Sequence, residues 1–434
     1  MLMQLSAAVH PARGSTVLAS LRLQIVTIWV GAVLLPAAAI VGLGIVPLAD
    51  LTLLSSMFTA AVALAFGQLM IRRVSSFPGA RAYSFILPSL AGSFGAVIVV
   101  MLLLRVSYTR SFFGSSFVMG VIIAFMISYW VDRFSRVRFH VVPEGREERI
   151  ASLLRLTSAD WPILSEADTL PPRREPIVAD LGCDLGTHWE RMLARAALAG
   201  HAVYDAKQLS ESLSGQVTIE HISENSFGSL LPNDAYLTVK RIADVVGCVL
   251  LLPVLLIPLT AIAIAIRLDS PGNVFFVQER MGYRGRVFRM VKFRTMRPRP
   301  VFEDSEAARA DAMTRNDDDR ITRVGRFLRR CRADELPQIL NVLKGDMSII
   351  GPRPEALALS QWYESEIPFY SYRHIVRPGI TGWAQINQGH VTDLDSIAMK
   401  LSYDFYYIKY FSAWIDIIIV MKTVPTVLKG LGAR

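Results

Sequence analysis

Cysteine is scarce in this sequence, and its scarcity excludes two classes of site. The three cysteines, Cys183, Cys248 and Cys331, lie far apart and form no C-x-x-C pair. Neither a disulfide framework nor a cysteine-bound zinc is therefore expected, and the chain suits a reducing, cytosolic face. A cleavable signal peptide is not indicated either, because the first apolar stretch is too long for one and others follow it.

Acidic residues are outnumbered: 37 Asp and Glu stand against 46 Lys and Arg, which leaves a formal net charge of +9. A basic balance is typical of chains that bind nucleic acid, anionic lipid or phosphorylated substrates. The basic runs are not interleaved with aromatic residues that could stack on bases, so nucleic acid is not expected as a partner.

Charge is absent from four long apolar stretches near the start of the chain. They cover residues 23–48, 51–71, 84–104 and 112–131. Each has roughly the 20 residues that cross a hydrocarbon core, and four in series argue against the buried helices of a soluble protein. Arginines such as Arg22, Arg73 and Arg133 gather on one side of the series. The positive-inside bias predicts four transmembrane helices in residues 1–138, with the N-terminus and all that follows residue 131 in the cytoplasm.

Residues 139–235 have the composition of a soluble α/β domain, in which strand-like runs alternate with helical patterns. The strand-like runs are 176–181, 201–206 and 216–222, and the helical patterns are 187–199 and 207–213. This order predicts a small parallel, Rossmann-like sheet. Gly182 and Gly186 follow the first run, but no G-x-G-x-x-G is present. We therefore expect a degenerate nucleotide-binding-like domain with a structural or regulatory role.

A fifth apolar stretch, residues 242–266, has basic residues on both flanks and prolines in its middle. Pro253 removes a backbone donor and clashes with the preceding turn, so it kinks or breaks a helix. From Ile242 to Pro253 a helix rises roughly 18 Å, just past the middle of a hydrocarbon core about 30 Å thick. We expect a re-entrant element that breaks at Pro253 and returns. A straight span is the alternative, and it would place the rest of the chain in the periplasm.

Arginine and lysine are concentrated in residues 274–388, where Gly282 and Gly285 interrupt the first basic run as in a hairpin. Arginine matches phosphate oxygens with paired donors, so the region suits a phosphorylated ligand. A solvated or lipid-facing surface explains part of this charge equally well.

The acidic pair Asp334-Glu335 follows these basic runs and precedes the rigid loop of Arg353, which can aim at an anion. Asp334 is predicted to cap a helix that ends at Gly345. The helix N-terminus and the arginines are expected to favour ionised carboxylates, and such a carboxylate can attack phosphorus. Ordinary capping is the simpler interpretation of the pair taken alone.

A match that covers roughly Tyr236 to Val427 is carried by six ordered motifs. They are KRIAD, GNVFFVQERMGYRGRVFRMVKFRTM, DDDRITRVGRFLRR, DELPQILNVLKGDMSIIGPRPE, RPGITGWAQIN and YDFYYIKYFSAWIDIIIVMKTV. Together they resemble the bacterial sugar transferase family, the monotopic phosphoglycosyl transferases. The part before them resembles the front of the long polyprenyl-phosphate hexose-1-phosphate transferases of polysaccharide synthesis.

The resemblance implies a fold and a reaction. The fold is membrane α plus α/β: four transmembrane helices, a small Rossmann-like domain, and a mostly helical catalytic domain, residues 236–434, anchored by the re-entrant helix and by interfacial helices such as 411–428. The implied enzyme transfers a hexose-1-phosphate from a UDP-sugar to undecaprenyl phosphate and releases UMP. It works at the cytoplasmic face of the bacterial inner membrane, as the first membrane step of exopolysaccharide, capsule or O-antigen synthesis.

The resemblance also implies roles for single residues. Asp334 is the expected nucleophile, which holds the sugar phosphate covalently, and Glu335 is expected to act as a base or to share Mg²⁺ with it. The remaining assignments are phosphate binding by Arg329, Arg353, Lys292 and Arg294, and the membrane break at Pro253.

The chain departs from the family pattern at three places: Arg332-Ala333 replaces Ser-Leu before the pair, Leu252 replaces a serine before the proline, and Gln388-Gly389-His390 replaces Gly-Arg. Two other functions fit the sequence, a one-step Mg²⁺-dependent transferase and a non-catalytic membrane subunit of a polysaccharide assembly. The sequence leaves open the sugar, the pathway, the role of the 139–235 domain and whether the chain forms a homo-oligomer.

Overall fold

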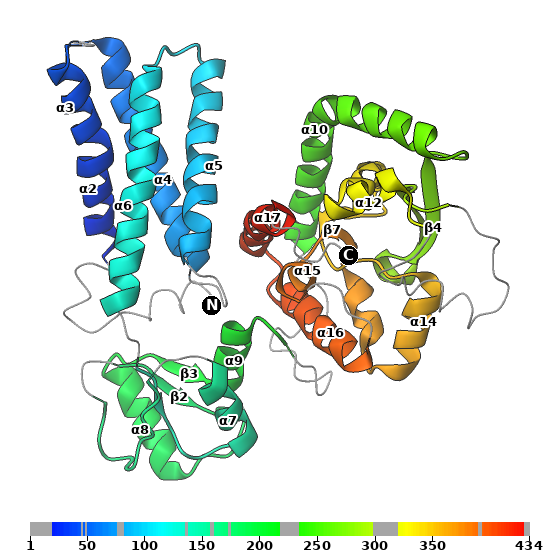
Figure 1. Cartoon of the computed structure of the whole chain (residues 1–434). Helices are drawn as coiled ribbons and strands as arrows, with labels where there is room; N and C mark the ends of the chain where they lie inside the picture. The colour runs from blue at the N-terminus through cyan, green and yellow to red at the C-terminus, as the bar shows by residue number, and fades with distance from the viewer. Residues whose placement is uncertain are drawn as a thin grey trace. The chain divides into compact units, whose positions relative to one another are not determined.

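The computed structural model describes residues 20–44, 47, 50–75, 82–134, 138–156, 160–171, 175–217, 234–297, 320–388 and 393–428. These residues are mostly helical, and the chain divides into two units, Met1–Gly215 and Gln216–Arg434. Figure 1 traces both units, from blue at the N-terminus to red at the C-terminus.

The first unit begins with apolar helices where the sequence predicts them. They are α2 (Leu21–Trp29), continued by the π-helical turn η1 (Val30–Leu34) and α3 (Leu35–Gly42), then α4 (Leu51–Ser75), α5 (Ala82–Leu103) and α6 (Arg110–Phe134). Each of the four segments is long and apolar enough to cross a membrane. Ile28, Leu64, Leu90 and Phe112 belong to a shared core, while Phe58 and other apolar side chains are exposed on the outside. Such an exterior suits hydrocarbon better than water, and membrane crossing itself remains a prediction.

A three-stranded parallel sheet with the order β1-β2-β3 follows in the same unit. Its elements are β1 (His140–Val141), α7 (Glu147–Leu156), β2 (Ile177–Ala179), α8 (Thr187–Leu198), β3 (Val203–Asp205) and α9 (Ala206–Ser214). The parallel sheet and both predicted helices are confirmed. The sheet is completed by β1, which was not predicted, and not by the predicted run 216–222. Residues 216 and 217 of that run lie outside any strand, and residues 218–222 lie outside the described residues.

At the start of α8, the chain's own carboxylate occupies a position where related sheets bind phosphate. Glu144 Oε2 accepts a hydrogen bond from the backbone N–H of Gly186, the N-cap residue of α8, at 2.7 Å. Nucleotide phosphates bind at such helix N-termini, beyond the carboxyl ends of parallel strands. The contact is consistent with the absence of a G-x-G-x-x-G motif, because both features argue against a bound dinucleotide at this helix.

The second unit begins with α10 (Asp234–Asp269), a helix of 36 residues that contains Pro253 and Pro258. Figure 1 shows α10 as two limbs joined at a bend. Proline inside a helix removes a backbone donor and crowds the preceding turn, which accounts for the bend. In place of the predicted break at Pro253, the structure has one continuous, bent helix, and this helix extends beyond the predicted 242–266.

A β-hairpin follows α10, as Gly282 and Gly285 predict. Strand β4 (Phe275–Met281) pairs antiparallel with β5 (Val287–Phe293) through the 3₁₀ turn η4 (Tyr283–Gly285). Gly285 has a φ of 71°, a left-handed conformation that glycine adopts at little cost.

The rest of the second unit consists of short elements and two longer helices. They are α12 (Arg323–Arg330), the 3₁₀ helix η5 (Ala333–Gln338), α13 (Ile339–Lys344), β6 (Ser348–Ile350), α14 (Leu357–Glu366), the 3₁₀ helix η6 (Tyr370–Ile375), β7 (Gly379–Thr381), α15 (Trp383–Asn387), α16 (Leu394–Lys409) and α17 (Ala413–Leu428). Strands β6 and β7 pair in parallel. The apolar run 411–428 is confirmed as a helix, and its contact with lipid remains a prediction.

A buried salt bridge joins the first turns of α10 to α17. Lys240 Nζ lies 2.6 Å from Asp416 Oδ2, and the hydroxyls of Tyr236 and Tyr407 donate to the same carboxylate at 2.6 and 3.0 Å. Both charged side chains are buried. Removing one member of such a pair leaves an uncompensated buried charge, which costs about 3–5 kcal/mol.

We expect Asp416→Asn to lower the Tm of the detergent-solubilised protein by about 5–10 °C, because Lys240 then loses its counter-charge. The double variant Lys240→Met with Asp416→Leu removes both charges and is expected to recover most of the loss. Thermal unfolding followed by circular dichroism measures both Tm values, and equal losses in the single and double variants would show that the unpaired Lys240 charge is not the source of the loss.

Candidate active site

The acidic pair lies in a 3₁₀ turn and not at the N-cap of an α-helix. The helix η5 follows Arg332, whose backbone is left-handed with a φ of 53°, and it contains Asp334, Glu335 and Pro337. The predicted capping role of Asp334 is therefore wrong, because the 3₁₀ helix already begins at Ala333 and has Arg332 as its N-cap residue. Gly345 does end the following helix α13, with a φ of 100°, as predicted.

Glu335 is buried and is held by cations from two other segments. Arg353 Nη2 donates to Glu335 Oε1 at 2.6 Å, and Lys292 Nζ lies 3.9 Å from the same oxygen. Burial by itself raises the pKa of Glu335, but Arg353 and Lys292 outweigh it and bring the pKa to about 2. Glu335 is therefore ionised at physiological pH.

Asp334 differs from Glu335 in the direction of its pKa shift and in its hydrogen bonding. Burial and the adjacent Glu335 raise the pKa of Asp334, against the opposing effect of Lys292, Arg353 and Arg329. The surrounding cations do lower this pKa, as expected, but burial and Glu335 outweigh them, so the net shift is upward and the expected ionisation-favouring balance is wrong. Within the part of the chain that the structure describes, no side-chain hydrogen bond involves the Asp334 carboxylate. Glu335 is therefore fixed by its ion pairs, whereas the Asp334 carboxylate accepts no side-chain hydrogen bond from the described residues.

The hairpin supplies the cationic surroundings of the pair. Burial lowers the pKa of Lys292 on β5 to about 8, although Glu335 opposes this. Arg280 on β4 donates through Nη1 to the carbonyl oxygen of Pro354 at 2.9 Å, and burial lowers its pKa to about 10. In the sequence, Arg280 is one basic residue of many, and nothing marks it as a support of the Arg353 loop.

A second buried arginine holds the loop of Arg353 from behind. Arg373 Nη2 donates to the carbonyl oxygen of Arg353 at 2.9 Å and lies 2.8 Å from Asp404 Oδ2 on α16. Its Nη1 donates to the hydroxyl of Tyr370 at 2.7 Å, and its side chain is only 3% exposed. Lys400, also on α16, pairs with Glu355, which follows the loop. Sequence reasoning missed this support, because its members are spread over several elements.

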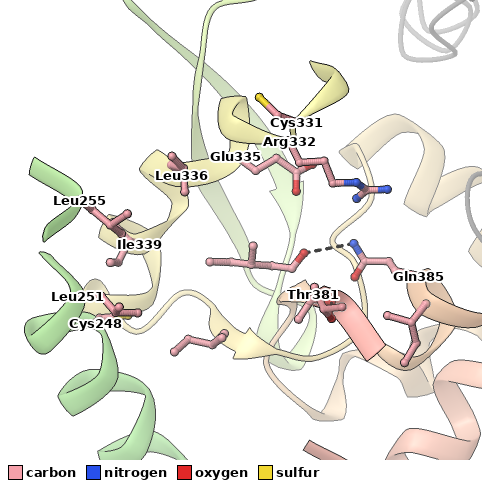
Figure 2. Close-up of a pocket in the computed structure, with 14 residues that line it drawn as sticks. Cys248, Leu251, Leu255, Cys331, Arg332, Glu335, Leu336, Ile339, Thr381 and Gln385 are labelled. Atoms are coloured by element: carbon pink, nitrogen blue, oxygen red, sulfur yellow. Dashed lines mark hydrogen bonds between the residues drawn. The ribbon is translucent and has the colours of Figure 1, made fainter. Parts of the chain in front are cut away.

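An apolar cavity of about 330 Å³ adjoins the pair (Figure 2). Its wall is formed by α10, η5, α13, β6, β7, α15 and α17, with Leu251, Leu255 and Ile339 among the apolar lining residues. Arg332 and Glu335 are the charged side chains on the wall. The pair is therefore bordered by cations from the hairpin and by an apolar space.

Comparison with known proteins places this site in a family. Residues 235–430 match the family described as bacterial sugar transferase. A relative from Aeromonas hydrophila, named UDP-N-acetylgalactosamine-undecaprenyl-phosphate N-acetylgalactosaminephosphotransferase, is 40% identical over 404 residues, which cover 93% of each chain. The chain belongs to the bacterial sugar transferase family.

Other sugar transferases align with less than half of this chain. A UDP-glucose:undecaprenyl-phosphate glucose-1-phosphate transferase of Escherichia coli K12 is 44% identical over 187 residues, 43% of this chain and 39% of its own. One of the same name from Xanthomonas campestris is 43% identical over 203 residues, 46% of this chain and 41% of its own. The membership expected from the sequence motifs is confirmed.

Of the phosphate-binding residues expected from the family, the structure brings Lys292 and Arg353 to the pair. Arg329 acts electrostatically on Asp334, and its Nε donates to Thr295 Oγ1 at 3.1 Å. Arg294 is not brought to the pair: its donors bond to the carbonyl oxygens of Ser270 and Pro271 at 2.7 and 2.9 Å. Arg294 therefore closes the end of α10, and Pro253 lies inside that same helix.

The acidic pair could supply only some of the ligands of a Mg²⁺ ion, and substrate phosphates and water would supply the others. Among the described residues there is no group of three or more His, Cys, Asp or Glu side chains that could hold a metal ion. Mg²⁺ commonly binds through one or two carboxylates together with substrate phosphates and water. Because Arg353 occupies Glu335 Oε1, Asp334 is the more available ligand. Mg²⁺ itself remains a prediction.

We expect Arg373→Met to lower kcat for sugar-phosphate transfer by about 10–100-fold, the range for residues that orient an active-site group. The reason is that the Arg353 carbonyl loses the donor that fixes its loop. Arg373→Lys keeps the charge and is expected to recover part of kcat.

The double variant Arg373→Met with Asp404→Leu separates positioning from stability, because it leaves no unpaired buried charge. We expect it to recover thermal stability but not kcat. Full activity in this double variant would contradict the positioning role of Arg373.

Proposed function

We propose that this sugar transferase moves a hexose-1-phosphate from a UDP-sugar to undecaprenyl phosphate and releases UMP, with Asp334 as a covalent nucleophile. The observation that carries the proposal is the difference between the two adjacent carboxylates. Glu335 is fixed by Arg353 and Lys292, whereas Asp334 is half-buried beside the same cations and accepts no side-chain hydrogen bond from the described residues. A carboxylate that attacks phosphorus needs this freedom, together with nearby positive charge.

The proposed reaction has two steps, and in each step one bond to phosphorus forms while another breaks. An oxygen of Asp334 forms a bond to the β-phosphorus of the UDP-sugar, and the bond from this phosphorus to the bridging oxygen breaks, so UMP leaves with that oxygen. A phosphate oxygen of the lipid then attacks the same phosphorus, and the Asp334 carboxylate leaves as an anion. Bound Mg²⁺ would neutralise diphosphate charge during this chemistry.

Glu335 serves chiefly to place cations in this scheme. Its pKa of about 2 makes it a weak base, so the base role expected from the family is disfavoured. Its ion pairs instead keep Arg353 and Lys292 beside Asp334, where they neutralise the donor phosphates.

The sugar is proposed from the relatives. The Aeromonas hydrophila relative, which aligns with 93% of this chain, is named for UDP-N-acetylgalactosamine, whereas the two relatives above that align with less than half of it are named for UDP-glucose. We propose these two nucleotide sugars as the first donors to test. The reaction would be the first membrane step of exopolysaccharide, capsule or O-antigen synthesis.

The membrane arrangement belongs to the same proposal. The four apolar segments of the first unit cross the inner membrane, the N-terminus lies in the cytoplasm, and α10 enters the membrane and returns at its bend. Both the 139–235 domain and the catalytic domain then lie on the cytoplasmic face, where nucleotide sugars are made.

The covalent route predicts exchange of labelled UMP into the UDP-sugar without any lipid acceptor. A one-step transferase does not allow this exchange, and a non-catalytic subunit releases no UMP at all. We expect Asp334→Asn to reduce exchange at least about 1,000-fold, because it removes the attacking oxygen anion. The measurement is radioactivity in purified UDP-sugar, with wild-type protein and added EDTA as a test of Mg²⁺. Undiminished exchange in Asp334→Asn would rule out this nucleophile.

The native cysteines test the course of α10. Cys183 precedes α10 and Cys331 follows it, and Cys331 is exposed whereas Cys248 is buried. If α10 is re-entrant, a membrane-impermeant maleimide labels both Cys183 and Cys331 in inside-out vesicles and neither in right-side-out vesicles. Cys183→Ser and Cys331→Ser assign the label to each position. Labelling of the two cysteines from opposite sides would show that α10 spans the membrane.

A further inference from the structure

The cavity beside the acidic pair has the make-up of a site for an apolar chain. Its volume of about 330 Å³ is at the small end of the range of about 300–1,000 Å³ for ligand pockets. The lining is mostly aliphatic, with Leu251, Leu255, Ile380 and Ile386 among its members. A uridine or a sugar would leave its polar groups without partners on such a wall, so the UDP-sugar is a poor occupant.

One end of the cavity is not apolar. Arg332 is the one cation among its lining residues, and the carboxylate of Glu335 is also on the wall. In Figure 2 the guanidinium of Arg332 extends toward the wall that carries Gln385. Gln385 Nε2 donates to the carbonyl oxygen of Ile380 at 3.2 Å, but its Oε1 is buried and accepts no hydrogen bond from the described residues.

A cation and an unsatisfied acceptor beside an apolar space match a phosphate ester with an apolar tail. Arginine donates paired hydrogen bonds to phosphate oxygens. A phosphate monoester in its singly protonated form also carries a donor for an acceptor such as Gln385 Oε1. Arg332 directly precedes the turn that carries the acidic pair, and Glu335 of that pair is on the same cavity wall, so a phosphate held by Arg332 lies beside the pair.

We propose that this cavity binds the first isoprene units of the lipid acceptor, and that Arg332, with Gln385, holds the acceptor phosphate. The proposal rests on the transferase function argued above and assigns the acceptor to its own subsite. The donor phosphates then meet Arg353 and Lys292 while the acceptor phosphate meets Arg332. Arg332 stands where the sugar transferase pattern usually has serine. This contact is therefore expected only in this chain and in relatives that also carry an arginine at that position.

Soluble isoprenyl phosphates of one, two and three isoprene units test the site, with the full-length purified protein. In the wild type we expect KM to fall by at least about tenfold from the shortest acceptor to the longest, because buried methylene groups each contribute about 0.8 kcal/mol. Leu251→Trp fills the cavity from α10 and is expected to remove this dependence on tail length. Inorganic phosphate is the competitor without a tail and is expected to inhibit only weakly.

Arg332→Asn tests the phosphate contact, since asparagine tolerates the left-handed backbone that Arg332 adopts. We expect it to raise KM for all three acceptors by about tenfold, the loss of a charged hydrogen bond, with partial recovery in Arg332→Lys. Arg326→Asn is the matched control, because it removes an exposed arginine of α12 that does not line the cavity.

UMP exchange without acceptor separates the possible failures. If exchange is absent in the wild type, the covalent transferase proposal fails. If exchange is present and both Leu251→Trp and Arg332→Asn keep wild-type KM values for every acceptor, the cavity is not the acceptor site. If inorganic phosphate competes as well as the longest isoprenyl phosphate, the site does not recognise the lipid tail.

Discussion

The buried ion pair between Glu335 and Arg353 is the interaction on which the catalytic part of this sugar transferase depends. It ties the turn η5 to the loop after β6 through one contact of 2.6 Å. Desolvation of two charges costs several kcal/mol, and the attraction offsets this cost only when other groups complete the geometry. Lys292 supplies a second cation to Glu335, and Arg373 holds the backbone of Arg353. Loss of either support leaves the pair in a poorer geometry at the same desolvation cost.

The sequence predicted those features that depend on local pattern. Uncharged stretches of membrane length became α2–α6, the glycines of the basic run became the β4–β5 turn, and Gly345 ended α13. The acidic pair and Arg353 also came together, because the motif separates Glu335 from Arg353 by only 18 residues, within which two short elements, α13 and β6, turn the chain back. Hydrophobic period and turn chemistry are properties of neighbouring residues, so one sequence is enough to read them.

Features that depend on tertiary burial were not predicted. Lys400 and Asp404 are four residues apart on α16, which in a sequence is typical of a solvated helix face. In the structure both are buried, beside Glu355 and Arg373 respectively. The pKa of Asp334 was expected to fall for the same reason: charges can be counted in a sequence, but the burial that opposes them cannot. Arg294 was assigned to the donor pocket by its motif, and only the path of the chain turns it to the end of α10.

The bend in α10 bears on how one helix supports both sides of the acidic pair. Cys248, Leu252 and Leu255 of α10 pack against the cluster that holds α13. Further along the same helix, Leu259, Ile262, Ala263 and Ile266 pack against the cluster that holds α12 and Ala333. Asp334 and Glu335 lie between those two packed segments along the chain, so the angle between the limbs sets the position of the acidic pair. A straight α10 could not support both sides at once, since its two apolar contacts would move apart. The prolines that bend the helix therefore act on the position of the acidic pair through packing alone.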